Sequence, residues 1–269
     1  MDELKDWGRK YYQAGGDPAL VSYIIFGHFE QPLEISMSSY RTAGVPDFID
    51  VHFHERDEEP ELLESFLDGY IGDWLKANDQ ALHATCKMAA AAIEIRGVLR
   101  EPMNLNYLRD VIGIITALSD KRGVGVLDCL ALRCYRPDEW KTIVWEPGVL
   151  HTSAMINTLV TKDPGGPGWW VSTRGMRKFG RPDVSVRGVP RPDTDTVVDF
   201  CNRLASMMAQ GAIVPSGKII KAPTIEGDLV CKLAGGPEDT TYHNQVIEID
   251  FPRQQTIRKT GPIRRVAAS

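Results

Sequence analysis

Two histidines, His52 and His54, have the spacing that most directly suggests chemistry. They lie in residues 47–54, where apolar and polar residues alternate as in a β-strand with one polar face. The two imidazoles therefore share a face, and His28 or His83 could add a third ligand to form a metal site. The alternative is a polar strand face near a sheet edge that carries two ordinary histidines. We favour this alternative, because a metal site also needs a convergent set of ligands.

The segment 173–183, with the sequence TRGMRKFGRPD, is the most distinctive block of the chain. Its glycines bracket one helical turn, from which Arg174, Lys178 and Arg181 could hold a carboxylate or a phosphate. The alternative is a tight connection between two strands, in which the glycines serve backbone geometry and the cations face solvent. We favour this second interpretation, because backbone geometry is the commoner use of glycine.

Two features suggest a protein partner. Trp169 stands beside Trp170 after a loop rich in proline and glycine, and exposed tryptophans are frequent anchors of protein interfaces. Residues 55–64 are strongly acidic and could attract a basic partner. The competing interpretation is that these acids only solvate the start of a helix, where carboxylates interact favourably with the helix dipole.

Sequence motifs for other kinds of chemistry are missing. The sequence contains no G-x-S-x-G elbow, Walker A loop or G-x-G-x-x-G fingerprint. The spacings from His83 to Cys86 and from Cys129 to Cys134 do not match a zinc motif. We therefore expect no cofactor, and we favour a protein that is not an enzyme.

Composition and charge narrow the class of protein. The net charge is -5, which argues against a nucleic-acid partner because neutralising phosphates needs a basic surface. The five cysteines are odd in number and scattered, as in proteins of a reducing cytosol. The N-terminal residues contain no apolar core of a signal peptide, and no apolar stretch approaches the about 20 residues of a membrane span. We expect a soluble, cytoplasmic protein with no membrane contact, and the sequence indicates no particular oligomeric state.

Hydrophobic periodicity predicts the elements that must position these residues. Helical spacing predicts helices from Pro60 through Trp74, over residues 104–120, and from Pro192 to Gly211. Apolar runs and alternating patterns predict strands at residues 20–26, 47–54, the end of 87–97, 124–127, 155–161, 168–172, 184–189, 226–233 and 245–251. A glycine-rich turn at residues 234–237 joins the last two strands.

The order of these elements predicts an α+β fold, with mixed sheets and packed helices. Strand, helix and strand around residues 104–120 suggest a crossover packed on a sheet. The fold forms either one domain or two similar α/β halves, residues 1–150 and 151–252. A basic tail follows at residues 253–269, which we expect to be mobile.

The block at residues 173–184, followed by the predicted helix at 197–208, resembles a bacterial family of uncharacterised proteins known as domain of unknown function 4261. In that family a segment T-R-G-hydrophobic-x-x-F-G-x-P-D/E follows one strand and leads into another, and this chain carries the same pattern. The similarity covers most of residues 20–235. It implies an α+β fold and a bacterial origin, and it supplies neither an activity nor a catalytic residue.

Two functional hypotheses follow. The first is a non-catalytic bacterial interaction protein, or an immunity-type accessory factor, that binds another protein. The second is a small-ligand-binding protein or enzyme that uses His52, His54 and the turn at residues 174–181. The second hypothesis requires these side chains to converge on one pocket.

Overall fold

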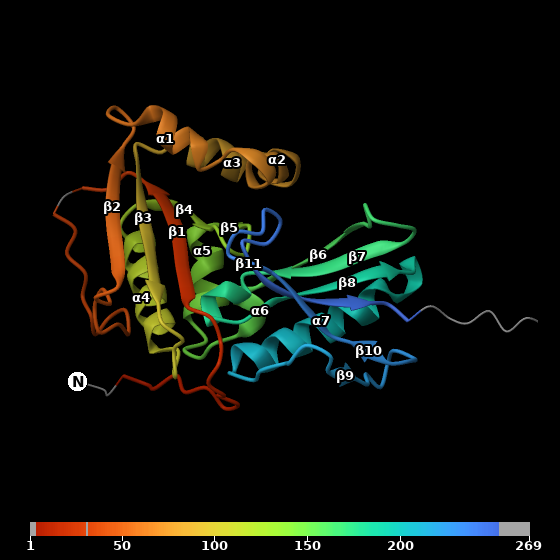
Figure 1. The fold of residues 1–269 in the computed structure, drawn as a ribbon. Helices are drawn as coiled ribbons and strands as arrows, with labels where there is room; N and C mark the ends of the chain where they lie inside the picture. The colour runs from red at the N-terminus through yellow and green to blue at the C-terminus, as the bar shows by residue number, and fades with distance from the viewer. Residues whose placement is uncertain (1–3, 31, 253–269) are drawn as a thin grey trace, which may run out of the picture.

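Two five-stranded β-sheets, each associated with one long helix, organise the chain (Figure 1). The computed structural model describes residues 4–30 and 32–252. Strands and helices are both abundant, so the predicted α+β fold with mixed sheets and packed helices is confirmed. The basic tail predicted at residues 253–269 lies outside the described residues.

The first sheet contains β1 (Ala19–Gly27), β2 (Ile49–Glu55), β3 (Ala91–Leu99), β4 (Gly123–Asp128) and β5 (Arg133–Tyr135), in the order β2-β3-β1-β4-β5. β1 lies at its centre, and every residue of β1 except Ser22 is buried. A strand covered on both faces has no polar side, which explains the continuous apolar run of its sequence. β3 and β4 both run antiparallel to β1 and are therefore parallel to each other. α4 (Asn106–Asp120) connects them as the predicted crossover helix.

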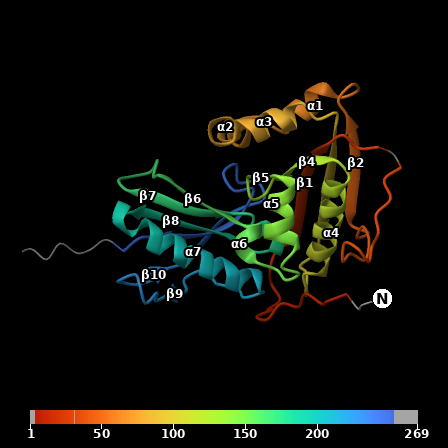
Figure 2. The same ribbon diagram turned by 180° about the vertical axis from the view of Figure 1, so that it is seen from behind.

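Helices pack against both faces of this sheet, and α4 lies in front of one of them in Figure 2. Tyr23 and Ile25 of β1 join the core that contains the apolar face of α4. Ile24 and Phe26 alternate with them and face the other way, into a smaller cluster. That cluster is completed by α1 (Pro60–Ser65), α2 (Gly69–Asn78) and α3 (Gln80–Lys87), three helices that we call the helical arm.

The helical arm differs from the single helix that the spacing of apolar residues predicts over this region. Gly69 has φ +67°, in the left-handed region, so the chain turns between α1 and α2. A Cβ on Gly72 would lie 1.7 Å from the carbonyl oxygen of Leu67, which shows how tightly the turn folds back. The prediction of one continuous helix is therefore wrong. The strand expected at the end of residues 87–97 is confirmed as β3.

The second sheet contains β6 (Asn157–Lys162), β7 (Trp169–Arg174), β8 (Asp183–Val189), β11 (Lys232–Gly236) and β12 (Asn244–Asp250), in the order β11-β12-β8-β7-β6. β6 and β7 form the predicted hairpin. β12 lies parallel to β8, and α7 (Thr194–Ala209) and the small ribbon of β9 (Ile219–Ile220) and β10 (Leu229–Val230) occur between them in the chain.

The prediction for residues 226–237 is wrong in detail. The expected strand is divided between β10 and β11, and most of the expected glycine-rich turn belongs to β11. The chain turns later, where the Asp239 carboxylate accepts hydrogen bonds from the backbone N–H groups of Thr241 and Tyr242. This side-chain-to-backbone bonding fixes the turn in place of the glycines.

One hydrophobic cluster extends across both sheets. It joins Tyr23 and Val111 of the first half to Met155, Phe179 and Val184 of the second. The connection between the halves runs through α5 (Pro137–Trp140), a π-helical turn (Lys141–Trp145) and α6 (Thr152–Met155). Within residues 4–30 and 32–252, every helix is too short or too polar to cross a membrane.

Candidate functional site

The cations of the predicted anion-binding turn lie inside the protein. Lys178 is fully buried and pairs with Asp128 at the end of β4. Arg181 is 1% exposed and donates to Glu101 at 2.8 Å. It also donates to backbone carbonyl oxygens on three separate segments of the chain, those of Gln13, Gly180, Gly211 and Ala212. We call Lys178, Arg181, Asp128 and Glu101 the buried interlock.

The buried interlock corrects the expectation that these cations face solvent. Glycine does serve backbone geometry in this turn, since Gly175 has φ +107° and Gly180 has φ +60°. Lys178 and Arg181, however, pair with carboxylates from other parts of the chain, and Arg181 also donates to carbonyl groups. These contacts join the two halves and leave Lys178 and Arg181 buried, so the turn does not present them to an anion in solution.

A second buried network closes the same turn. Asp183 accepts hydrogen bonds from the Thr173 hydroxyl, the backbone N–H of Met176 and the Asn244 amide. Burial raises the pKa of Asp183 to about 6 in spite of these donors. The threonine and the aspartate of the distinctive block are therefore structural residues.

Arg174 and Trp169, the other residues predicted to bind an anion or a partner, are also engaged within the protein. The Arg174 guanidinium is 4.0 Å from the centroid of the Tyr242 ring and donates to the carbonyl of Thr173. Trp169 is half-buried, and the guanidinium of Arg191 lies 4.5 Å from its ring. Neither side chain stands free on the surface as an anchor would.

His52 and His54 lie on β2, the edge strand of the first sheet. His54 Nδ1 is 2.7 Å from Glu59, while the two histidine rings are 6.2 Å apart. Within the described part of the chain, no group of three or more histidines, cysteines, aspartates or glutamates could hold a metal ion. The strand face therefore carries a hydrogen bond between His54 and Glu59, and the metal site is not supported by a third ligand.

The histidines and the buried interlock occupy opposite faces of the first sheet. His52 is paired with Glu94, and Glu94 with Ile24, so the histidines share the face covered by the helical arm. Lys178 instead contacts Tyr23, whose side chain points to the other face. The two groups do not converge on one pocket, and the hypothesis of a site that combines them is wrong.

A groove between the helical arm and the second sheet is the candidate functional site. It has a volume of about 510 Å³ and lies where the arm extends over β5 towards β6 (Figures 1 and 2). Its walls are Tyr70, Trp74, Leu75, Asp79 and Leu82 from the arm, Leu132, Arg133, Cys134 and Glu139 from the end of the first sheet, and residues 157–161 of β6. We call it the arm groove.

The free edge of β6 forms one wall of the arm groove. β6 is the last strand of its sheet, and five consecutive residues of it line the groove. Successive side chains of a strand point to opposite faces, so a consecutive run indicates that the edge of the strand borders the groove. An edge strand presents backbone N–H and C=O groups that have no partner strand. β6 contains neither proline nor a charged residue before Lys162 to block such pairing.

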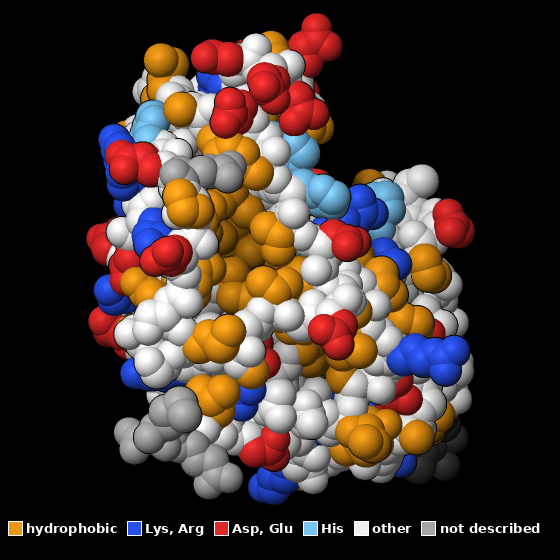
Figure 3. All heavy atoms as spheres, turned by 90° about the vertical axis from the view of Figure 1, so that its left-hand side faces the viewer, with side chains coloured by type: hydrophobic (Ala, Val, Ile, Leu, Met, Phe, Trp, Pro, Cys, Tyr) orange, Lys and Arg blue, Asp and Glu red, His pale blue; other side chains and the backbone are white. Residues whose placement is uncertain are grey.

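The opposite wall combines exposed aromatic rings with negative charge. Tyr70 is 50% exposed and Trp74 is 43% exposed, although both lie on a helix that packs against the core. Residues 57–79 carry one lysine, Lys76, against the acidic residues Asp57, Glu58, Glu59, Glu61, Glu64, Asp68, Asp73 and Asp79. Figure 3 shows acidic side chains gathered at the top of the molecule, over α1. Within the arm itself, residues 60–87, five acidic residues stand against Lys76 and Lys87, and Asp79 is the acid among them that lines the groove.

The charged residues inside the groove are fixed by local contacts. Asp79 caps α3 by accepting from the N–H of Leu82, and Arg136 reaches both of its carboxylate oxygens at 2.6 and 2.8 Å. The Leu82 N–H, together with Arg136, holds the pKa of Asp79 below its ordinary value. Arg133 pairs with Glu139 at 3.1 Å. The charged side chains that line the groove are thus paired with one another or with neighbouring residues.

The lining residues provide binding contacts and no paired nucleophile and base. Cys134 is the one thiol among them, and its hydrogen bond with Cys86 together with burial raises its pKa well above the ordinary value. A protonated, buried thiol is a poor nucleophile. The arrangement therefore suits recognition of another molecule.

Sequence reasoning missed this groove. The helical spacing predicts Tyr70 and Trp74 on the buried stripe of one long helix, whereas the chain breaks at Gly69 and leaves both rings exposed. The acidic run at residues 55–64 was noted and does lie at the start of the arm. No family model, curated protein or solved structure matches the chain significantly, so the resemblance to domain of unknown function 4261 stays a prediction.

Proposed function

We propose that this protein is a non-catalytic interaction protein, which binds an extended, basic segment of a partner protein in the arm groove. One observation carries the proposal: the unpaired edge of β6 faces an acidic helical arm with exposed aromatic rings across a groove. An extended segment can add itself to a free sheet edge through main-chain hydrogen bonds. Its side chains would then contact the arm.

Each part of the groove contributes differently to binding. Main-chain pairing with β6 supplies affinity without sequence preference, because every peptide carries the same backbone groups. Tyr70 and Trp74 offer large rings of the kind that dominate binding energies at interfaces. The acidic residues of the arm favour lysine and arginine in the partner and accelerate its approach. In this proposal a bacterial accessory or immunity-type factor acts by occupying a strand of its target.

A display library of short random peptides, selected on the full chain, tests the proposal. We expect enriched peptides to alternate apolar residues with lysine or arginine. Trp74→Ala is expected to weaken their binding at least about tenfold, as the loss of an interface anchor does. Because Trp74 is partly exposed, this substitution should leave the fold intact.

Tyr11→Ala is the matched control, because Tyr11 has the same exposed fraction of 43% as Trp74 and lies outside the lining of the groove. Its binding should equal that of the unmodified chain. Enrichment of acidic peptides, a failure to enrich any peptide, or equal affinity of the Trp74→Ala variant would each overturn the proposal.

A further inference from the structure

A second cavity, separate from the arm groove, lies where the N-terminal segment crosses α4. It has a volume of about 650 Å³, within the range of about 300–1,000 Å³ typical of small-molecule sites. Its apolar walls come from Leu4, Trp7, Met37, Ile112, Val144 and Trp145. It shares no lining residue with the arm groove. We call it the N-terminal cavity.

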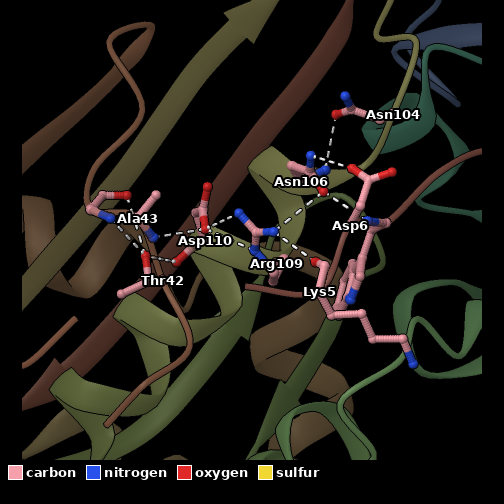
Figure 4. Close-up of polar contacts among 10 residues, drawn as sticks. Lys5, Asp6, Thr42, Ala43, Asn104, Asn106, Arg109 and Asp110 are labelled. Carbon is pink, nitrogen blue, oxygen red and sulfur yellow. Dashed lines mark hydrogen bonds and ion pairs between the residues drawn. The ribbon is translucent and has the colours of Figure 1, made fainter. Parts of the chain in front are cut away.

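A polar network around Arg109 of α4 holds the rim of this cavity (Figure 4). The Arg109 guanidinium is 2.9 Å from the Asp110 carboxylate and donates to the carbonyl of Lys5 at 2.7 Å. Asp110 in turn accepts from the backbone N–H of Ala43 at 3.0 Å, and its carbonyl accepts from the Thr42 hydroxyl. α4 thereby fixes the N-terminal segment on one side and the loop with Thr42 on the other. A site held in this way needs little ordering when a ligand binds.

Two irregular pieces of backbone meet at the cavity. The chain forms a π-helical turn over Lys141–Trp145, closed by a hydrogen bond from the N–H of Glu146 to the carbonyl of Lys141 at 2.8 Å. π-helical turns are rare and occur frequently at functional sites. Arg41, which also lines the cavity, has φ +52°, a conformation that non-glycine residues seldom adopt. Backbone strain of this kind tends to gather at ligand-binding sites.

Trp145 connects these two features. The Arg41 guanidinium lies 4.4 Å from the centroid of its ring and donates to its carbonyl oxygen at 3.2 Å. Trp145 thereby holds the Arg41 guanidinium at the cavity wall.

The charge of the lining defines the ligand. Lys5, Arg41 and Arg109 are its charged residues, and no acidic residue lines the cavity, although the chain as a whole is acidic. Asp110 neutralises Arg109, which leaves Lys5 and Arg41 to attract an anion. We infer that the N-terminal cavity binds an amphipathic carboxylate, with its apolar body among the hydrophobic walls and its carboxylate near Lys5 and Arg41.

Calorimetric titration of the full chain tests this inference with decanoate and naphthoate as probes, which have an alkyl and an aryl body respectively. We expect at least one of them to bind with a sub-millimolar dissociation constant. Decyltrimethylammonium has a similar apolar body and the opposite charge, and it should bind at least about tenfold more weakly than decanoate if decanoate is the ligand. Failure of both carboxylates to bind, or equal binding of the cation and decanoate, would overturn the inference.

Variants locate the site. Arg41→Met keeps an unbranched side chain without the guanidinium and should weaken binding of the carboxylate about tenfold. Arg203→Met is the matched control, because Arg203 is an exposed cation at a different apolar groove, beside α7. Unchanged affinity in Arg41→Met would place the carboxylate elsewhere and contradict the inference.

Discussion

Replacing Lys178 with methionine would test the buried interlock between the two halves. Lys178 and Asp128 have side chains that are 0% and 1% exposed. Removing one partner of such a pair leaves an uncompensated buried charge, which costs about 3–5 kcal/mol. Asp128 keeps the backbone N–H groups of Leu130 and Ala131 as donors, at 3.1 and 3.0 Å. We therefore expect Lys178→Met to lower the free energy of unfolding by about 3 kcal/mol, the lower end of this range.

Urea denaturation followed by circular dichroism measures this loss, and a double variant separates its cause. Asp128→Asn removes the remaining charge and keeps an oxygen for the two backbone donors. If the unpaired charge causes the instability, Lys178→Met combined with Asp128→Asn should be at least about 1 kcal/mol more stable than Lys178→Met alone. If lost packing causes it, the second substitution should not help.

The surface pair of Lys76 and Asp73 provides the control. Their side chains are 58% and 79% exposed at a separation of 3.7 Å, so Lys76→Met should change stability by less than about 0.5 kcal/mol. A loss below about 1 kcal/mol in Lys178→Met, or a double variant no more stable than the single one, would refute the reasoning.

Two further predictions concern the same turn. Because the pKa of Asp183 is raised to about 6 from the ordinary 3.8, its ionisation destabilises the folded chain at neutral pH, and this penalty falls away as the pH decreases through 6 towards 3.8. The free energy of unfolding of the unmodified chain, relative to that of Asp183→Asn, should thus rise by about 2 kcal/mol from about pH 7 to about pH 4. Urea titrations of both proteins at each pH measure this difference. A difference that does not change with pH would contradict the prediction. Gly180→Ala, whose Cβ would lie 2.3 Å from the Asp17 carbonyl, should be more destabilising than Gly188→Ala, which has a similar φ of +69° and open space. Equal thermal midpoints in the two variants would count against the steric argument.

The regular elements of the fold could be predicted because their periodicity reflects burial directly. The central position of β1 explains its continuous apolar run, and one apolar stripe identifies α4. The helical arm is harder to predict from the sequence, because its apolar spacing continues through a break that depends on the left-handed conformation of Gly69. β11 was misplaced because glycines can stand inside a strand when a later carboxylate, that of Asp239, fixes the turn.

The site could be predicted only in part, because its geometry depends on distant pairs. Glycine's role in the turn at residues 174–181 follows from local sequence, whereas the burial of Lys178 depends on Asp128, fifty residues earlier. The partner of Arg181, Glu101, is eighty residues away. Likewise, a strand pattern identifies β6 but does not tell whether it lies at the centre or at the edge of a sheet. No local pattern encodes these pairings.

Amide hydrogen exchange along β6 tests the proposed function most directly. When a basic peptide occupies the arm groove, the amides of residues 157–162 that point away from β7 should exchange at least about tenfold more slowly, because they gain a partner strand. The amides already paired with β7 should change little. If the peptide binds, exchange along β6 is unchanged and protection appears only on another surface, the proposed function is contradicted.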